Sequence, residues 1–175
     1  MARPLRVGLV SDAPAIRVGL GYDVHAFAED RPLVLGGVQF AHHGGLLGHS
    51  DADVLLHAIA DALLGAAGLG DIGEHFPPGD PQFEGIASTL LLARVAGMLN
   101  AKGWVALNVD STLIAERPKI APAAASMRAN IAAALGISVE QVGVKATTNE
   151  RMGFLGREEG IAAMAVALIG RASSD

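Results

Sequence analysis

Hydrophobic positions follow a helical spacing in three segments of the chain. The clearest begins near residue 50, where Leu55, Ile59 and Leu63 recur at four-residue steps and glycines end the run soon afterwards. Because such steps place side chains on one face, the pattern predicts a helix buried along that face. Shorter runs of the same kind, each followed by a glycine, predict helices over residues 88–100 and 123–135.

Extended hydrophobic runs predict four longer strands, over residues 16–22, 104–115, 142–148 and 161–169. A hairpin is also predicted where two short runs flank Gly36-Gly37, since a two-glycine turn suits antiparallel strands. Strands alternating with helices indicate an α+β or α/β domain with one sheet and helices packed on one face. The last run has little polar alternation, so its second face needs cover, which a symmetric oligomer would supply.

The composition limits the possible classes of function. The 175 residues suffice for one domain, and 51% hydrophobic with 18% charged residues indicates a globular fold. A formal net charge of -5 gives no electrostatic case for binding nucleic acid or an anionic membrane. The chain has no cysteine, which excludes disulfides, thiol nucleophiles and iron–sulfur clusters. Any metal site must therefore use His, Asp and Glu.

The start of the chain has no hydrophobic run typical of a signal peptide, and no segment is long and apolar enough to span a bilayer. We therefore expect a cytoplasmic protein. Residues 1–15 are interpreted as an N-terminal extension, and residues 16–172 as a single domain.

The first candidate for chemistry is the stretch GYDVHAF, in which Asp23 and His25 stand two residues apart. On a strand, side chains at this spacing share a face. A carboxylate and an imidazole presented together suit a divalent ion, zinc in particular. The alternative is a simple His–Asp hydrogen bond at the end of a strand. From the spacing alone, that alternative is favoured over a metal site.

Four polar residues at four-residue steps, His49, Asp53, His57 and Asp61, would form a stripe on the predicted helix if it begins near Ser50. Ser50 followed by Asp53 also fits a variant of the capping box, with Ser50 as the N-cap. That capping role is the alternative to a functional one for both residues.

His57 has only apolar neighbours in the sequence, so its imidazole needs a buried partner. A metal ion shared with Asp23 and His25 would provide that partner, and Asp61 could then orient a ligand. Two imidazoles and one carboxylate leave the fourth tetrahedral position open, which is typical of a catalytic zinc.

Three later loops carry weaker candidates. The segment DIGEHFPP from residue 71 offers backbone groups and an aromatic ring, or is an ordinary surface loop. Arg117 and Lys119 suit phosphate or base contacts, although solvated charges are the simpler interpretation. The run from Lys145 ends in hydroxyls and Glu150, which suits Mg²⁺ that keeps water and phosphate ligands. The threonines there also fit ordinary strand formers before a polar turn.

Together these pieces resemble the 2-C-methyl-D-erythritol 2,4-cyclodiphosphate synthase family of the non-mevalonate isoprenoid route. The resemblance runs from about residue 17 to 170 and rests on four blocks in order: RVGLGYDVHAF, GLLGHSDADVLLHAIADALLGAAGLGDIGEHFPP, NVDSTLIAERPKIAP and VKATTNERMGFLGREEGIAAMAVAL. No single block is as specific as the four together.

The resemblance implies an α+β two-layer sandwich, with one mixed sheet and helices on one face. It further implies a homotrimer whose sheets face a central axis, with active sites between subunits. The implied substrate is 4-diphosphocytidyl-2-C-methyl-D-erythritol 2-phosphate. Its 2-phosphate attacks the β-phosphorus of its own diphosphate and CMP leaves, so no protein nucleophile is required.

The resemblance also implies roles for individual residues. Asp23, His25 and His57 are expected to ligate Zn²⁺, and Glu150 to hold Mg²⁺ or Mn²⁺. The implied catalytic residues are His49, Asp53 and Thr148. The implied substrate-binding residues are Ser50, Asp71, Ile72, Gly73, Phe76, Asp80, Ala115, Pro118, Lys119, Ala121, Ala146, Thr147, Phe154 and Arg157.

Within this set, Phe154 and Arg157, with Glu159, resemble residues around a central trimer cavity associated with isoprenoid diphosphates. Pro78 departs from the family pattern because some members carry an acid there, and Asp80 is the expected substitute.

Two other functions fit parts of the pattern. A non-catalytic trimeric module could bind isoprenoid diphosphates, although intact metal ligands at a separate site disfavour it. A generic zinc phosphohydrolase would use water as the nucleophile and give linear products.

Overall fold

The computed structural model describes residues 16–42 and 44–172. The predicted extension, residues 1–15, lies outside the described residues. Among the helices that are described, none combines the length and the hydrophobicity needed to cross a membrane.

A five-stranded sheet forms one layer, in the order β4-β1-β7-β5-β6. Its strands are β1 (Ile16–Ala28), β4 (Gly45–Leu46), β5 (Trp104–Ile114), β6 (Val142–Thr147) and β7 (Gly160–Arg171). The pair β5–β6 is parallel, whereas β1–β4, β1–β7 and β5–β7 are antiparallel. The predicted mixed sheet is thus confirmed, and two strands are longer than their hydrophobic runs indicated.

A separate hairpin joins β2 (Leu33–Leu35) to β3 (Val38–Phe40), as predicted. Gly36 and Gly37 both have positive φ, 59° and 69°, which is the backbone conformation that a primed two-residue turn requires. The short strand β4 pairs with the end of β1.

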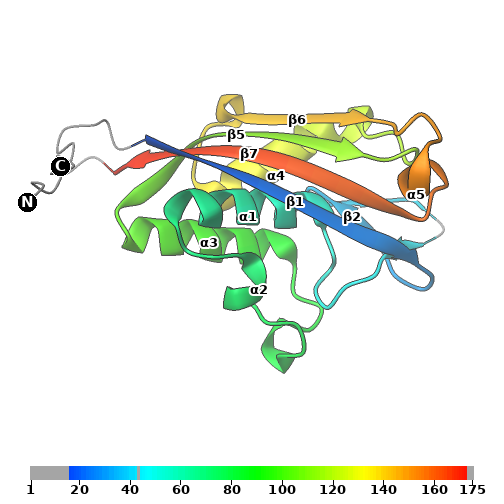
Figure 1. Cartoon of the computed structure of the whole chain (residues 1–175), viewed down its shortest axis with the longest axis horizontal. Coiled ribbons are helices and arrows are strands. Elements are labelled where there is room, and N and C mark those ends of the chain that lie inside the picture. The colour runs from blue at the N-terminus through cyan, green and yellow to red at the C-terminus, as the bar shows by residue number, and fades with distance from the viewer. Residues whose placement is uncertain (1–15, 43, 173–175) are drawn as a thin grey trace, which may run out of the picture.

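The second layer consists of α1 (Val54–Ala67), α3 (Ser88–Ala101) and α4 (Ala124–Leu135), which lie together on one face of the sheet (Figure 1). The predicted α+β arrangement is therefore confirmed. Short elements lie in the connections: α2 (Ile72–His75), α5 (Gly153–Gly156) and the 3-10 turns Pro81–Phe83, Ala121–Ala123 and Val139–Gln141.

The predicted start of the first helix is wrong by several residues. Asp53, and not Ser50, is the N-cap of α1, and its carboxylate accepts a hydrogen bond from Leu56 N. Only His57 and Asp61 of the expected four-residue stripe lie within the helix. The hydrophobic period could not locate this boundary, because Ser50 and Asp53 are both good capping residues.

Helix α1 lies directly against the backbone of β1 because two glycines face it. A Cβ at Gly19 would come within 1.9 Å of Ala62 O, and one at Gly21 within 1.9 Å of Ala58 O. This close approach brings the side chains near the end of β1 within reach of those on α1.

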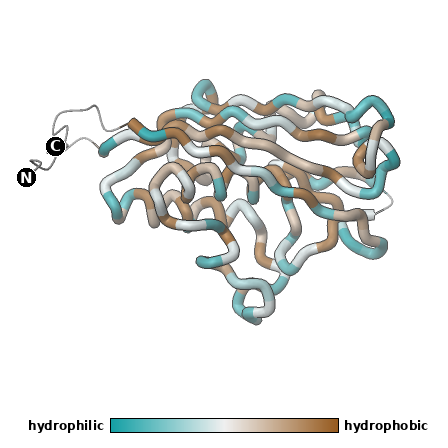
Figure 2. Tube along the Cα trace, viewed as in Figure 1, coloured by the Kyte–Doolittle hydropathy of each residue, from teal (hydrophilic) through white to brown (hydrophobic). Residues whose placement is uncertain are grey.

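The opposite face of the sheet carries exposed hydrophobic side chains. Val18 and Leu20 on β1 are 66% and 64% exposed, and Met164 and Val166 on β7 are also exposed. Figure 2 shows hydrophobic stretches along this part of the sheet. A single chain leaves this surface uncovered, and patches of this kind typically mark an interface.

Candidate metal and phosphate site

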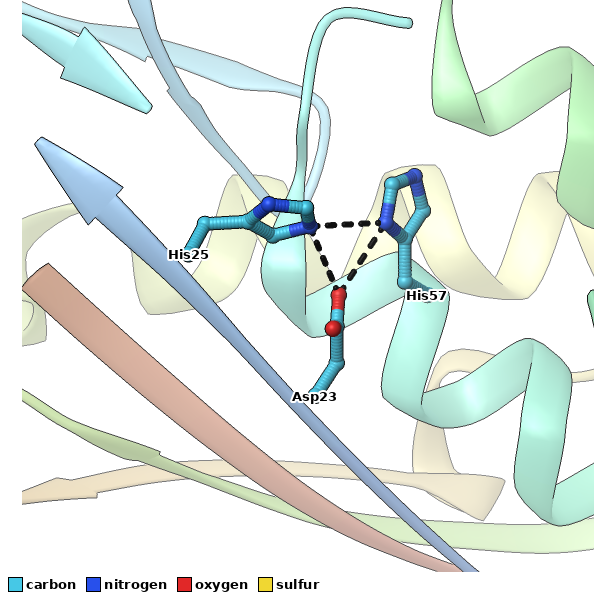
Figure 3. A group of neighbouring side chains, drawn as sticks. All are labelled: Asp23, His25 and His57. Carbon is cyan, nitrogen blue, oxygen red and sulfur yellow. Dashed lines mark hydrogen bonds and ion pairs between the residues drawn. The ribbon is translucent and has the colours of Figure 1, made fainter. Parts of the chain in front are cut away.

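Three ligand atoms from two elements converge on one point (Figure 3). Asp23 Oδ2 lies 2.9 Å from His25 Nε2 and 3.1 Å from His57 Nδ1, and the two nitrogens are 3.2 Å apart. Ligands about 2.0–2.1 Å from a tetrahedral zinc lie roughly 3.3 Å from one another. The triad therefore has the donor set and nearly the spacing that zinc requires, with small outward shifts.

Both elements contribute through their regular geometry. Asp23 and His25 are two residues apart on β1, so their side chains leave the same face. His57 lies in the first turn of α1, next to Ala58, whose carbonyl oxygen faces Gly21. The predicted grouping of Asp23, His25 and His57 as a possible metal site is present in the structure.

The tautomer of His25 is set by a backbone carbonyl. Its Nδ1 lies 2.6 Å from Leu47 O. A carbonyl oxygen can only accept, so the proton must be on Nδ1, and Nε2 presents its lone pair to Asp23 and His57 when the ring is neutral. Such a hydrogen bond also fixes the ring orientation of a metal ligand.

The tautomer of His57 is set through a buried serine. Ser88 Oγ donates its only hydrogen to Asp51 Oδ1, so at 3.0 Å from His57 Nε2 it can only accept from the ring. The carboxylate of Asp51 also accepts a hydrogen bond from Ser88 N. When the ring is neutral, His57 Nδ1 is therefore left unprotonated toward the triad. We name this arrangement the His57–Ser88–Asp51 chain.

Sequence reasoning missed both Ser88 and Asp51. Ser88 is 31 residues from His57, and its local sequence indicates only the start of a helix. Asp51 resembles an ordinary capping residue within HSDAD. Neither has a local sequence signal for a hydrogen bond to a candidate metal ligand.

The electrostatics of the triad favour a charged pair when no metal is bound. Burial acts to raise the pKa of Asp23, but hydrogen bonds and charge from His25 and His57 outweigh it and hold the pKa well below its usual range. Burial acts to lower the pKa of His25, yet the Asp23 carboxylate raises it overall. A cation such as zinc would therefore compete with a proton at His25.

A pocket of about 240 Å³ opens beside the triad. It is walled partly by hydrophobic side chains, among them Phe76, which packs edge-on against Phe83 with ring centroids 5.3 Å apart. Besides the triad, the lining residues are His49, Ser50, Ile72, Gly73, Phe76, Pro78, Phe83 and Leu91. Four of the expected substrate-binding residues, together with the expected catalytic residue His49, thus meet around the triad.

Other residues expected at this site support it from outside the pocket. Asp71 is the N-cap of α2, with its carboxylate accepting from Glu74 N. Asp61 accepts a hydrogen bond from Ile72 N at 2.8 Å, so it anchors the start of α2. The expectation that Asp61 orients a ligand is replaced by this role, since Ser88 and Ser50 are the partners of His57 Nε2.

Asp53 and Asp80 also bond to protein groups. The fully buried Asp53 carboxylate accepts from Gly36 N, Gly37 N and Leu56 N, which ties the hairpin turn to α1. Asp80 accepts from Gln82, and its carbonyl oxygen lies 3.2 Å from His49 Nε2. Among the described residues, neither lines the pocket beside the triad.

A second pocket, of about 340 Å³, lies where the parallel strands β5 and β6 end. It gathers the remaining expected contacts for nucleotide and second metal. Its lining is Ala115, Pro118, Lys119, Ile120, Ala121, Ala146, Thr147, Thr148 and Glu150. Among described residues it shares none with the pocket beside the triad. One chain therefore carries two separate groups of candidate site residues, which we call the triad pocket and the strand-end pocket.

Phe154, Arg157 and Glu159 belong to neither pocket lining. They lie on α5 and the turn before β7, with Phe154 exposed and Arg157 Nε 2.6 Å from Glu159 Oε1. A ring and a charged pair are thus presented together on the surface.

Similarity to known proteins identifies the family of this chain. The model of the YgbB family matches residues 16–170. The chain belongs to the YgbB family. A YgbB-type relative, the 2-C-methyl-D-erythritol 2,4-cyclodiphosphate synthase of Pseudomonas fluorescens (strain SBW25), is 61% identical over 157 residues, which cover 90% of this chain and 100% of the relative.

Solved structures agree with this YgbB assignment. The bifunctional IspDF of Campylobacter jejuni matches with a TM-score of 0.87 and 42% identity, covering 91% of this chain and 43% of that protein. This chain therefore spans less than half of the bifunctional protein. IspF of Plasmodium falciparum, solved as a CDP complex, matches with a TM-score of 0.79 and 33% identity, covering 93% of this chain and 100% of that one.

Proposed function

We propose that this protein is a cyclodiphosphate synthase of isoprenoid biosynthesis, a lyase that forms 2-C-methyl-D-erythritol 2,4-cyclodiphosphate. The proposed substrate is 4-diphosphocytidyl-2-C-methyl-D-erythritol 2-phosphate, and CMP is the leaving group. The observation that carries the proposal is the convergence of Asp23, His25 and His57 at the edge of the triad pocket, in a chain 61% identical to a synthase.

The triad is the proposed zinc site, in keeping with its donor set and spacing. A zinc ion held there supplies positive charge to the oxygens of the diphosphate. The chain's own contribution is orientation: Leu47 O and the His57–Ser88–Asp51 chain keep both imidazoles aimed at one point.

His49 and Ser50 are proposed to contact phosphate and erythritol oxygens beside the triad. Gly73, in the first turn of α2, is proposed to offer backbone groups to the erythritol hydroxyls, with Ile72 and Asp71 next to it. Phe76 supplies an apolar wall. Such a wall limits the access of water to the diphosphate, which favours attack by the substrate's own phosphate.

The strand-end pocket is the proposed cytidine site. Its small residues Ala115, Ala121 and Ala146 leave room for a planar base, while Lys119 offers positive charge to phosphate. The exposed carboxylate of Glu150 can hold Mg²⁺ or Mn²⁺, which prefers a few oxygen ligands plus phosphate oxygens. Thr148 Oγ1 donates to Glu150 Oε1 at 3.1 Å, so hydroxyl and carboxylate are presented together.

We propose a homotrimer in which the triad pocket of one subunit faces the strand-end pocket of the next. The exposed hydrophobic face of β1 and β7 supports an assembly with the sheets around an axis. Phe154, Arg157 and Glu159 would then border a central cavity able to take an isoprenoid diphosphate. The same proposal places the protein in the cytoplasm, where the pathway's soluble intermediates are available.

The test is incubation of the cytidyl substrate with the zinc- and magnesium-loaded protein, followed by CMP quantification and phosphorus NMR. The expected result is one CMP per ring-shaped diphosphate. Linear products would instead support a zinc phosphohydrolase. Binding of isoprenoid diphosphate without any CMP would support the non-catalytic module and overturn the proposed reaction.

A further inference from the structure

The segment after β6 has an unusual backbone that one side chain holds in place. Glu150 and Arg151 both adopt left-handed conformations, with φ of 50° and 61°. Non-glycine residues in this region cost about 1 kcal/mol or more each, and persist where surrounding contacts over-determine them. Two in succession therefore need a specific restraint.

Glu116 provides that restraint from the neighbouring loop. Its Oε1 accepts hydrogen bonds from Asn149 N and from Arg151 N, each at 3.0 Å. These two amides flank Glu150, so a single carboxylate oxygen fixes the backbone on both sides of it. An amide-to-carboxylate hydrogen bond is stronger than one between neutral groups.

The contact joins the ends of two adjacent parallel strands. Glu116 follows β5, and the turn at residues 149–151 follows β6. The backbone bond from Ala115 N to Thr147 O, at 3.0 Å, already aligns the two chains just before the turn. Glu116 thus continues the β5–β6 pairing into a region where the sheet itself has ended.

The other side of the turn is packed against α5. A Cβ at Gly156 would lie 2.1 Å from the carbonyl carbon of Arg151, so α5 meets the turn backbone directly. Glu116 holds one side of the turn and α5 closes the other. The direction in which Glu150 leaves the backbone is consequently fixed before any ligand arrives.

We propose that Glu116 is a positioning residue for Glu150: it holds the left-handed turn that presents the Glu150 carboxylate and the Thr148 hydroxyl to the strand-end pocket. This rests on the proposed function, in which Glu150 binds the second divalent ion. Glu116 touches neither that ion nor the substrate in this role. It determines how much of the time Glu150 is available in the productive direction.

The experiment compares Glu116→Ala with Glu116→Gln, which keeps an acceptor oxygen at the same reach. The control is Glu158→Ala, which removes a carboxylate that borders the same loop and pairs with Arg117 at 3.8 Å, leaving the Glu116 bonds intact. Hydrogen exchange of the Asn149 and Arg151 amides is measured by NMR in the assembled, zinc-loaded protein. We expect both amides to exchange at least about tenfold faster in Glu116→Ala only, because they lose the carboxylate oxygen that accepts their hydrogen bonds.

The second measurement is Mn²⁺ binding followed by electron paramagnetic resonance, with CDP present. Glu116→Ala should bind Mn²⁺ about tenfold more weakly, Glu116→Gln should restore most of the affinity, and zinc content should not change. In the turnover assay, excess Mn²⁺ should recover the activity of Glu116→Ala.

Unchanged amide exchange in Glu116→Ala would overturn the proposed restraint. Faster exchange with unchanged Mn²⁺ affinity would show that the turn is restrained without serving Glu150, and would also overturn the proposal. If the wild-type protein formed no CMP, the proposed reaction would fail, whereas the exchange and Mn²⁺ measurements would still decide the role of Glu116.

Discussion

The triad pocket and the strand-end pocket differ in how complete each is within one chain. In the triad pocket, three ligand atoms lie within 3.2 Å of one another, and hydrogen bonds to Leu47 O and Ser88 Oγ fix the two imidazoles. In the strand-end pocket, Lys119 and Glu150 are exposed. There the position of Glu150 is set by the left-handed backbone turn at residues 150 and 151. A metal site can be assembled from one subunit, whereas a diphosphate that spans both pockets needs two subunits in the proposed trimer.

The largest effect is expected from removing the ligand that α1 contributes. His57→Ala should lower turnover about 1,000-fold or more, equivalent to roughly 4 kcal/mol, because the proposed zinc site would lose one of its three ligands. Elemental analysis should find the zinc gone, while the oligomeric state is kept. Retained zinc would contradict the ligand assignment, and His42→Ala, whose ring lies outside the triad, is the control.

Mixing two inactive variants tests directly whether the pockets come from different subunits. His57→Ala damages only the triad pocket and Glu150→Ala only the strand-end pocket. After joint refolding, hybrid trimers should recover up to about a quarter of wild-type activity, since that share of interfaces pairs two intact halves. If mixing recovers nothing while each variant still assembles, sites shared between subunits are ruled out.

The restraint behind His57 should matter less than the ligand itself. Ser88→Ala should weaken zinc binding by about 10- to 100-fold, the usual cost of losing a hydrogen-bond partner behind a metal ligand. Competition with a chelator measures this affinity without any turnover. Ser111→Ala is the matched control, because that serine is equally buried but donates to Gly143 O. Equal zinc affinity in both variants would refute the role of the His57–Ser88–Asp51 chain.

A smaller effect is expected at the strand-end pocket. Lys119→Ala should weaken CMP binding by about tenfold or less, because an exposed ammonium makes a solvent-screened contact with phosphate. Isothermal titration of CMP measures it, with the exposed Lys102→Ala as control. Unchanged CMP affinity would remove Lys119 from the proposed cytidine site.

The last expected effect concerns stability instead of turnover or binding, and it comes from Asp53. Burial raises the pKa of this carboxyl to about 6, although hydrogen bonds from Gly37 N and Gly36 N act to lower it. A raised pKa means that the folded chain binds the proton more tightly than the unfolded chain does. The contribution of Asp53 to the free energy of unfolding is therefore greatest below its usual pKa of 3.8 and falls as pH rises through about 6.

Asp53→Asn removes this titration. Between about pH 4 and pH 6, the slope of unfolding free energy against pH should differ between the two proteins by up to about 1.4 kcal/mol per pH unit. Urea unfolding at several pH values, at one protein concentration, measures it. Parallel slopes would show that Asp53 keeps an ordinary pKa in the fold.

The contrast between the pockets also explains what could be predicted from the sequence. Hydrophobic periods located the sheet and the three main helices, because burial on one face leaves a regular spacing. Asp23 and His25 could be paired because neighbours two apart on a strand share a face. His57 could be added only by arguing that a buried imidazole needs a partner.

The remaining site residues depend on contacts between distant segments. Ser88 contacts His57, which is 31 residues away in the sequence, and Glu116 contacts Arg151, which is 35 residues away. No local sequence pattern predicts either contact. The start of α1 was misplaced for a different reason: two capping residues stood three apart, and the choice between them depended on the hairpin amides that Asp53 bonds.

The missing Cβ atoms at Gly19 and Gly21 have a consequence for the metal itself. The separation of β1 and α1 also sets how far His57, the third proposed zinc ligand, lies from Asp23 and His25. An alanine at position 21 would force strand and helix apart, so His57 would draw away from Asp23 and His25 although every ligand remained. A measurement of zinc affinity would therefore report how closely α1 packs against β1.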